Sequence, residues 1–249
     1  MAKIAALKNY PEVKILDGKK IATTFKKQIV KKVKKMKTAP TLAVILVGRN
    51  SASSHYVAIK KKFAREVSVK FYLFHYPSQI KEKVLIERIS GLNQDKKING
   101  ILVQLPPPKH LNANKIIAAI DPLKDVDGFG PKTKVVPGLN LSILKLIKTA
   151  RQNLKNKRAV IIAKSETFSQ SLAKFLKKEK IKIKIVKPTS ADLARQTKKA
   201  DLLISAVGQP KFIKDSMVKK GAIMIDVGTT YKNGKVYGDI SNQAGKLAS

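Results

Sequence analysis

The sequence predicts an α/β protein of two domains, the second of them Rossmann-like. Two observations carry this prediction. Short apolar runs rich in β-branched residues alternate with amphipathic segments, which is the pattern of a mainly parallel sheet covered by helices. The alternation is interrupted once, at residues 121–137, by a stretch rich in glycine, proline and charge, and then restarts. We place the domain boundary in this stretch, which gives domains of residues 1–130 and 131–249.

The first domain is expected to alternate helices with strands. Apolar residues recur every three or four positions over residues 18–37 and predict an amphipathic helix, with an apolar face of Ile21, Phe25, Ile29, Val33 and Met36. The elements that follow are a buried strand at 41–47, a helix at 51–67 capped by a residue of 51–54, a strand at 69–74, a helix at 80–92, and a strand at 100–105 stopped by three prolines.

The second domain is expected to begin with a helix at 139–149 and to continue with strands. Apolar runs predict strands at 159–163, 181–186, 202–207 and 222–227. Helices at 169–179 and 191–199 separate the first three strands. This rhythm is typical of a Rossmann-like unit.

Composition excludes several classes of protein. The chain has 249 residues, of which 43% are hydrophobic, so it can bury a sizeable core. It contains no cysteine, which excludes disulfides, thiolate metal sites and a cysteine nucleophile. No apolar run approaches the ~20 residues of a membrane helix, and the apolar stretch after Met1 is too short for a signal peptide. We therefore expect a soluble, cytoplasmic protein, and we identify no metal site.

The net charge of +36 favours nucleic acid as an alternative partner, because lysine and arginine neutralise phosphates. The charge is spread along the chain rather than gathered in a tail or patch, and aromatic residues make up only 6%. These features indicate a lysine bias on solvated faces. We expect nucleic acid to bind only non-specifically, through bulk positive charge.

Several polar side chains stand where open α/β sheets bind ligands. Tyr56 and Lys60 are four residues apart, on one face of the predicted helix that follows the first strand. Gln104 ends an apolar strand, where a buried amide needs a partner. Asp127 shares a glycine-containing turn with Asp125. Taken singly, each pattern has a structural explanation: a core aromatic beside a solvated lysine, a satisfied amide, and ordinary turn chemistry. For the short Tyr-x-x-x-Lys pattern alone, that explanation should hold in roughly nine cases of ten.

The same residues also belong to three long segments in a fixed order. They are Ala-Ser-x-x-Tyr-Val-x-x-Lys at 52–60, Gly-Ile-Leu-Val-Gln-Leu-Pro-x-Pro-Lys-His at 100–110, and Ile-Asp-Pro-x-Lys-Asp-Val-Asp-Gly-Phe at 120–129. In these segments the chain resembles the bifunctional methylenetetrahydrofolate dehydrogenase/methenyltetrahydrofolate cyclohydrolase family. The resemblance extends from Ile15 to Gly238-Asp239 and so covers nearly the whole chain.

The resemblance implies oxidation of 5,10-methylenetetrahydrofolate with NADP, then hydrolysis of the methenyl product to 10-formyltetrahydrofolate. The N-terminal domain would be the catalytic, folate-binding domain, the second would bind NADP, and the protein would be a homodimer. Lys60 falls on the catalytic lysine, which must be a neutral amine for part of the cycle. Gln104 would orient it, Tyr56 would stack on the substrate, and Asp127 would bond the pterin. The implied folate contacts are Tyr56, Lys60, Val103, Gln104, Leu105 and Asp127.

The cofactor segments depart from the family pattern. The family's loop Gly-Arg-Ser-x-x-Val-Gly-x-Pro aligns with residues 163–171, where both glycines are replaced and Glu166 adds a negative charge. The His-Ser-Arg-Thr-type stretch is replaced by residues 187–190, without its arginine. The resemblance implies NADP contacts at Ala163, Lys164, Ser165 and Thr229. The dehydrogenase half is less firmly predicted than the cyclohydrolase half.

Several alternatives stay open. The chain stops at Ser249, before a glycine-rich segment that family members carry, so we expect either a fragment or a naturally short protein. It could hydrolyse the methenyl compound without the dehydrogenase activity. It could also be a catalytically weak homologue that binds folate or a protein partner. A basic nucleic-acid-binding protein on an old enzyme scaffold ranks last.

Overall fold

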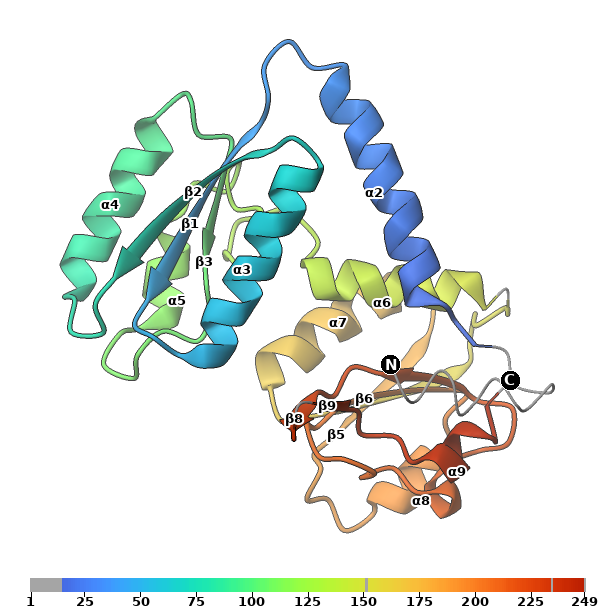
Figure 1. The fold of residues 1–249 in the computed structure, drawn as a ribbon. Helices are drawn as coiled ribbons and strands as arrows, with labels where there is room; N and C mark the ends of the chain where they lie inside the picture. The colour runs from blue at the N-terminus through green and yellow to red at the C-terminus, as the bar shows by residue number, and fades with distance from the viewer. Residues whose placement is uncertain (1–14, 151, 234, 249) are drawn as a thin grey trace. The chain divides into compact units, whose positions relative to one another are not determined.

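The structure, a computed structural model, describes residues 15–150, 152–233 and 235–248 (Figure 1). They form two compact units, one of Lys19–Gly138 and one of residues 139–248 with 15–18. Both units combine parallel strands with helices, so the predicted two-domain α/β class is confirmed. The boundary at residue 130 stays a prediction about the functional domains. The apolar stretch after Met1 and the chain end at Ser249 lie outside the described residues.

The unit of residues 19–138 is built on a three-stranded parallel sheet in the order β2-β1-β3. The central strand β1 (Thr41–Val47) pairs along its length with β2 (Lys70–Tyr76) and over four residues with β3 (Gly100–Val103). Apart from Thr41, every residue of β1 is apolar, as expected of a strand covered on both faces. All three predicted strands of this domain are confirmed, with small shifts at their ends.

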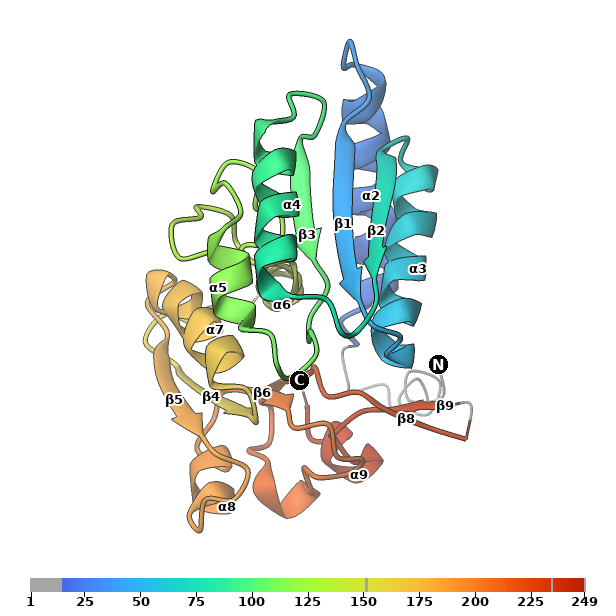
Figure 2. The same cartoon turned by 90° about the vertical axis from the view of Figure 1, so that its left-hand side faces the viewer.

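Helices cover both faces of this sheet (Figures 1 and 2). α4 (Glu82–Gln94) and α5 (Ala113–Ala118) lie on one face and bury a cluster that includes Ile45, Leu85, Ile89, Ile101 and Ile116. α3 (Ser51–Glu66) lies on the other face, where its Val57 packs with Val44, Leu46 and Leu102. Each side chain of this size stabilises the fold by about 1.5–3 kcal/mol when fully buried. The packing therefore holds α3 firmly against the sheet.

Some helix ends of this unit differ from the prediction. α3 is capped by Asn50, whose side chain accepts a 3.0 Å hydrogen bond from Ser53 N, so the predicted cap within 51–54 was wrong. α2 (Gly18–Lys34) ends before Met36, which is 54% exposed, so the predicted helix end at residue 37 was wrong: Met36 is the only apolar residue among the lysines of that stretch. The sequence pattern does not predict α5, since six residues give less than two helical turns.

The second unit contains a four-stranded parallel sheet in the order β5-β4-β6-β7. All four predicted strands are confirmed, as β4 (Arg158–Ala163), β5 (Lys182–Val186), β6 (Leu202–Ala206) and β7 (Ile223–Asp226). The first of them in the chain, β4, lies between the second and the third. The strand order therefore reverses between β4 and β6, at the switch point where open α/β sheets bind ligands beyond their carboxyl ends.

Helices also cover both faces of the second sheet (Figures 1 and 2). α6 (Gly138–Thr149) and α7 (Glu166–Lys178) pack on one face, with Ile143, Ile147, Leu172 and Leu176 in the core. The elements that contribute to the core of the other face include α8 (Leu193–Thr197) and α9 (Asn242–Gly245). A hairpin of β8 (Thr230–Lys232) and β9 (Lys235–Tyr237) follows β7. In the part of the chain that is described, no helix is long and apolar enough to span a membrane.

Candidate functional site

Lys60 and Gln104 meet at the carboxyl end of the first sheet. Lys60 lies on α3, the helix that follows β1, and Gln104 comes directly after the last residue of β3. The backbone N–H of Gln104 donates to Ile45 O of β1 at 2.9 Å, so the sheet ladder fixes its main chain. Nζ of Lys60 donates a 2.7 Å hydrogen bond to Oε1 of Gln104. The fold thus joins two of the predicted residues through their side chains.

The orientation of the Gln104 amide follows from its partners. The residue is 8% exposed, so both ends of the amide need a hydrogen bond. Its oxygen must face Lys60, because an ammonium group has donors but no acceptor. Its Nε2 donates to Leu105 O at 2.8 Å. The Gln104 amide is therefore satisfied and held in one orientation.

A buried carboxylate builds the turn that presents Asp127. Asp125, 2% exposed, accepts hydrogen bonds from the backbone N–H groups of Asp127, Gly128 and Gly130 at 3.2, 2.9 and 2.7 Å. Gly128 has φ +76°, and a Cβ there would lie 2.7 Å from Val135 O, so only glycine fits. Of the two aspartates in this turn, Asp125 organises the backbone and Asp127 is left for other contacts.

Lys60 and Asp127 attract each other, but burial dominates both groups. Burial lowers the pKa of Lys60, and the negative charge of Asp127 opposes this effect only in part. Burial raises the pKa of Asp127, with Lys60 opposing the effect and Asp125 adding to it. In each case the loss of solvation outweighs the attraction. A lysine in this place releases its proton at lower pH than a lysine on the surface.

The other predicted folate contacts differ in how exposed their side chains are. Tyr56 lies one helical turn before Lys60 and is 49% exposed, with its ring edge-on to that of His55. Leu105 is half-buried beside Gln104. Val103 is 3% exposed, and its side chain packs in the core on the α4 side of the sheet. Any contact of Val103 with a ligand would therefore be made by its main chain.

Three predicted cofactor residues form the connection from β4 to α7. Ala163 ends β4 and pairs with Ala206 of β6 across the switch point. Lys164 is exposed. Ser165 caps α7, and its side chain accepts a 3.2 Å hydrogen bond from Phe168 N. This cap starts α7 at Glu166, so the predicted start at residue 169 was wrong.

Thr229 comes from a different strand end. It lies shortly after β7, and its Oγ1 donates to Val227 O at 3.2 Å. The turn after β6 approaches it, because a Cβ on Gly208 would lie 3.8 Å from Thr229 O. Gly208 has φ +70°, a left-handed conformation that favours glycine. The connections after β4, β6 and β7 therefore all stand at one edge of the sheet.

Two features of this edge favour an anion such as the pyrophosphate of a dinucleotide, and one opposes it. The first N–H groups of α7 have no acceptor within the helix, and the helix dipole adds partial positive charge there. Lys164 contributes a full charge, whereas the exposed Glu166 opposes an anion. Ser169, which replaces a family glycine, is 1% exposed and donates to Glu166 O at 3.0 Å. Its side chain thus folds onto the helix and does not fill the loop.

The sequence analysis missed one buried acidic residue near this edge. Asp239 is fully buried and accepts hydrogen bonds from the end of β6 and from the turn that follows it. Its local sequence is an ordinary Gly-Asp pair. The partners lie 30 to 34 positions earlier in the chain, so no local pattern indicates them.

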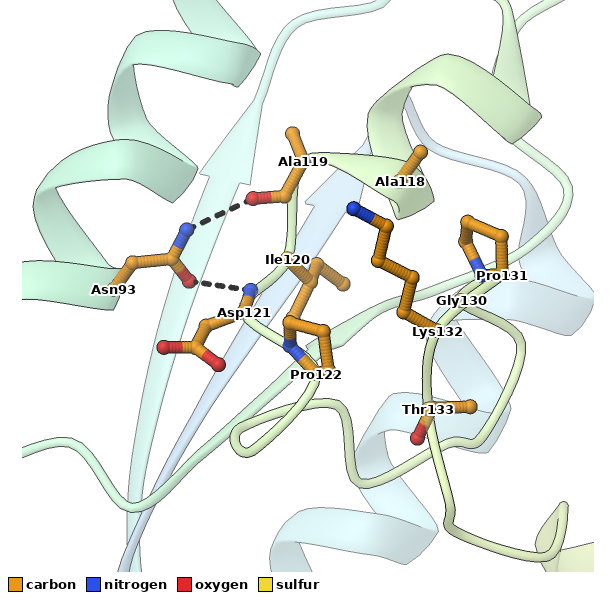
Figure 3. A pocket seen from close by; sticks show the side chains of 10 residues that line it. All are labelled: Asn93, Ala118, Ala119, Ile120, Asp121, Pro122, Gly130, Pro131, Lys132 and Thr133. Carbon is orange, nitrogen blue, oxygen red and sulfur yellow. Dashed lines mark hydrogen bonds between the residues drawn. The ribbon is translucent and has the colours of Figure 1, made fainter.

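A pocket of about 580 Å³ in the first unit contains none of the predicted site residues (Figure 3). The side chain of Asn93 crosses one side of it, donating to Ala119 O at 2.8 Å and accepting from Asp121 N at 2.9 Å. These bonds hold the segment after α5 in place, which is a structural role. Among the residues that the structure describes, no three His, Asp or Glu side chains gather closely enough to hold a metal ion.

Two family models match the chain in sequence. Residues 16–127 match the catalytic domain of tetrahydrofolate dehydrogenase/cyclohydrolase, and residues 137–249 match the NAD(P)-binding domain of the same family. The bifunctional protein FolD of Thermodesulfovibrio yellowstonii is 38% identical over 240 residues, which are 91% of this chain and 84% of that protein.

Solved structures agree with these matches. The bifunctional FolD dehydrogenase/cyclohydrolase of Campylobacter jejuni superposes with a TM-score of 0.90 at 34% identity, covering 95% of this chain and 89% of that chain. The methylenetetrahydrofolate dehydrogenase-cyclohydrolase of Trypanosoma brucei, solved with NADP cofactor and inhibitor, has a TM-score of 0.88 at 25% identity. It covers 95% of this chain and 88% of that chain.

Proposed function

The chain belongs to the tetrahydrofolate dehydrogenase/cyclohydrolase family, and we propose that Lys60, Gln104 and Asp127 carry its folate chemistry. It is a bifunctional enzyme of one-carbon folate metabolism. It oxidises 5,10-methylenetetrahydrofolate to the 5,10-methenyl compound with NADP and hydrolyses that compound to 10-formyltetrahydrofolate. The observation that supports the residue roles is the hydrogen bond between Lys60 and Gln104 at a half-buried position.

Lys60 is proposed as the base of the hydrolytic step. A neutral Nζ takes a proton from a water molecule as the water oxygen bonds to the cationic methenyl carbon. The hydroxyl group of this adduct then loses its proton to solvent as the carbonyl forms and the bond from the carbon to one of the two nitrogens breaks. The freed nitrogen takes the proton held by Lys60, and the formyl group remains on the other nitrogen. Burial favours the neutral amine before substrate binds, and the positive charge of the substrate favours it further.

Gln104 and Asp127 are proposed to orient the reacting groups. The Gln104 amide holds Nζ of Lys60 in one direction, which limits the rotamers that a free lysine would explore. Asp127 offers a carboxylate to hydrogen-bond donors of the pterin, from a turn fixed by Asp125. Tyr56, one turn away on α3, supplies an exposed aromatic face for stacking. Main-chain groups of Val103 and Leu105 complete the proposed contacts.

The second unit is proposed to hold NADP at the carboxyl edge of its sheet. When bound, NADP supplies the two-electron oxidant for the dehydrogenase reaction. Lys164 and the N-terminus of α7 would meet the phosphates, with Ala163 and Ser165 shaping the connection and Thr229 approaching from β7. The positions of these residues at the switch point support this assignment.

A cyclohydrolase without dehydrogenase activity is the second candidate. Glu166, together with the absence of glycine from residues 163–171, favours it, because both weaken pyrophosphate binding. Two assays separate the candidates. Protein is mixed with methylenetetrahydrofolate and NADP while NADPH formation is followed at its absorbance maximum. In the second assay, methenyltetrahydrofolate is the only substrate. Activity in both supports the bifunctional enzyme, and activity in the second alone supports the cyclohydrolase; inactivity in both contradicts the proposal.

We further propose that the enzyme is a cytoplasmic homodimer and that nucleic acid binds it only through bulk charge. The absence of cysteine and the resemblance to the family support the first part. The spread of the +36 net charge along the chain supports the second. Light scattering coupled to size exclusion measures the mass in solution, and a monomer would contradict the homodimer. Nanomolar nucleic-acid binding at physiological salt would contradict the bulk-charge explanation.

A further inference from the structure

Asp239 is a carboxylate with no exposed surface, and nothing above gives it a role in the reaction. One of its oxygens accepts from Ser205 Oγ and from Val207 N, each at 2.7 Å. The other accepts from Gln209 N at 2.9 Å. Val207 and Gln209 are the two ends of the turn whose middle residue is Gly208. A single buried carboxylate therefore fixes the N–H groups at the two ends of the turn that follows β6.

A second carboxylate holds the segment that carries Asp239. Asp226, the last residue of β7, accepts from the backbone N–H groups of Asp239 and Ile240 at 2.9 and 3.0 Å. Each carboxylate also lies against a glycine that is within two positions of the other aspartate in the chain. A Cβ on Gly228 would lie 2.0 Å from the Asp239 carboxyl carbon, and one on Gly238 would lie 2.1 Å from an Asp226 oxygen. The two aspartates and two glycines therefore form one interdependent arrangement.

This arrangement stands at the switch point of the sheet. The turn 207–209 follows β6, the strand that pairs with β4 up to Ala163. The residues after β4 are those proposed to meet the phosphates of NADP. On the other side, a Cβ on Gly208 would lie within 3.8 Å of Thr229 O. A ligand at the switch point passes between the connection after β4 and the connection after β6. The geometry of the turn therefore bears directly on how the ligand is held.

We propose that Asp239 is a positioning residue for NADP, which holds the turn 207–209 in its binding geometry before the cofactor arrives. The inference rests on the proposed function in that this unit binds NADP. A turn that is already fixed loses little conformational freedom on binding, so more of the contact energy appears as affinity. Asp239 itself does not touch the cofactor, because it is buried behind the turn.

The test compares NADP affinity with folate hydrolysis in one variant. In Asp239→Asn the amide nitrogen must face one of the three donors, which leaves a buried N–H or O–H without an acceptor. Loss of a charge-assisted bond of this kind corresponds to a rise of about tenfold or more in the dissociation constant. Isothermal titration of the purified protein with NADP measures that constant. The rate of methenyltetrahydrofolate hydrolysis without NADP should stay within about twofold of wild type, since Lys60 lies in the other unit.

Ser205→Ala is the matched control. It removes one hydrogen bond to the same carboxylate but none of the bonds to the turn, so NADP should bind it nearly as well as wild type. Equal NADP affinity in Asp239→Asn and wild type would overturn the proposal, as would an equal loss of NADP affinity and hydrolysis. If wild type itself does not bind NADP, the dehydrogenase function fails rather than this inference.

A measurement on wild type covers the case in which Asp239→Asn does not fold. Amide hydrogen exchange of Val207 and Gln209 should be strongly protected in the protein without NADP, because Asp239 already bonds both N–H groups. Rapid exchange that slows only after NADP is added would show that the turn forms on binding. That result would overturn the proposal whatever the variants do.

Discussion

Nζ of Lys60 lies 2.7 Å from Oε1 of Gln104, so one charge-assisted hydrogen bond joins helix α3 to the end of strand β3. The partner of the lysine in this bond is a neutral amide and adds no negative charge. Burial therefore lowers the pKa of Lys60. The charge of Asp127 acts in the opposite direction. The balance of these two effects sets how much of the lysine is neutral at a given pH, and several measurable consequences follow from it.

Asp127→Asn should move the pH profile of hydrolysis to lower pH. The negative charge of Asp127 raises the pKa of Lys60, so its removal lets burial lower that pKa further. More of the amine is then neutral at a given pH. The measurement is kcat for methenyltetrahydrofolate hydrolysis against pH, with substrate at saturation. Asp95→Asn, on an exposed residue at the end of α4, removes the same charge elsewhere and should leave the profile unchanged. A shift of the Asp127→Asn profile to higher pH would contradict the electrostatic role.

Gln104→Glu should have the opposite effect. It places a carboxylate where the amide oxygen now lies, 2.7 Å from Nζ, and this charge favours the protonated lysine. The pH profile should move to higher pH, and the rate at pH 7 should fall by about tenfold for each unit by which the pKa of Lys60 rises. Gln104→Met separates the effect of the added charge from the effect of losing the amide, because it removes the hydrogen bond without adding charge. If Gln104→Glu keeps the wild-type profile, Gln104 does not control the lysine.

Lys60→Met should remove a pH dependence of the stability of the folded protein. The pKa of Lys60 is lower in the folded state than its ordinary value of 10.5, so the unfolded chain binds the proton more tightly. The free energy of unfolding therefore falls as pH drops from 10.5 through the folded pKa, and methionine carries no such charge. The stability of the variant relative to wild type should therefore fall as pH rises from 7 towards 10.5, whereas the loss of the hydrogen bond to Gln104 adds the same cost at both pH values. Urea denaturation at the two pH values measures this change, and a stability difference that is the same at both would show that burial of Lys60 is not unfavourable.

Two glycine-to-alanine variants should change stability in opposite directions. In Gly228→Ala the new Cβ would lie 2.0 Å from the Asp239 carboxylate, and overpacking of this kind costs about 1–3 kcal/mol. In Gly91→Ala, inside α4, the new Cβ has no neighbour within 4 Å, and alanine should stabilise the helix by about 0.5–1 kcal/mol. Thermal unfolding of both variants gives the comparison. Equal stabilities would show that the space beside Gly228 relaxes freely.

The positions of the strands were predictable because a buried parallel strand is a short apolar run in the sequence. β1 and β4 are of this kind, and both lie where the pattern predicts them. Helix ends were less predictable, because several residues compete for each cap. Asn50 caps α3 although serines follow it, and Ser165 starts α7 three residues before the predicted position. The short α5 and the hairpin of β8 and β9 give too few residues for a periodic signal.

The candidate site also has features that the sequence predicts and features that it does not. Motif order identifies Lys60, Gln104 and Asp127, but not the hydrogen bond between the first two or the way Asp125 shapes the turn. Those facts depend on which strands pair, and hence on the whole fold. Asp239 is the clearest example, since its partners come from β6 and the turn after it. A buried charge with distant partners leaves no periodic trace in the sequence.

Whether Lys60 performs the hydrolytic step is decided by the rate at which Lys60→Ala consumes 5,10-methenyltetrahydrofolate, followed by the loss of its absorbance. Removal of a general base lowers a rate by about 10²–10⁴-fold, so the variant should approach the rate in buffer. Lys61→Ala, an exposed neighbour on the same helix, should hydrolyse the substrate like wild type. A folded Lys60→Ala variant that retains the wild-type rate would contradict the assignment.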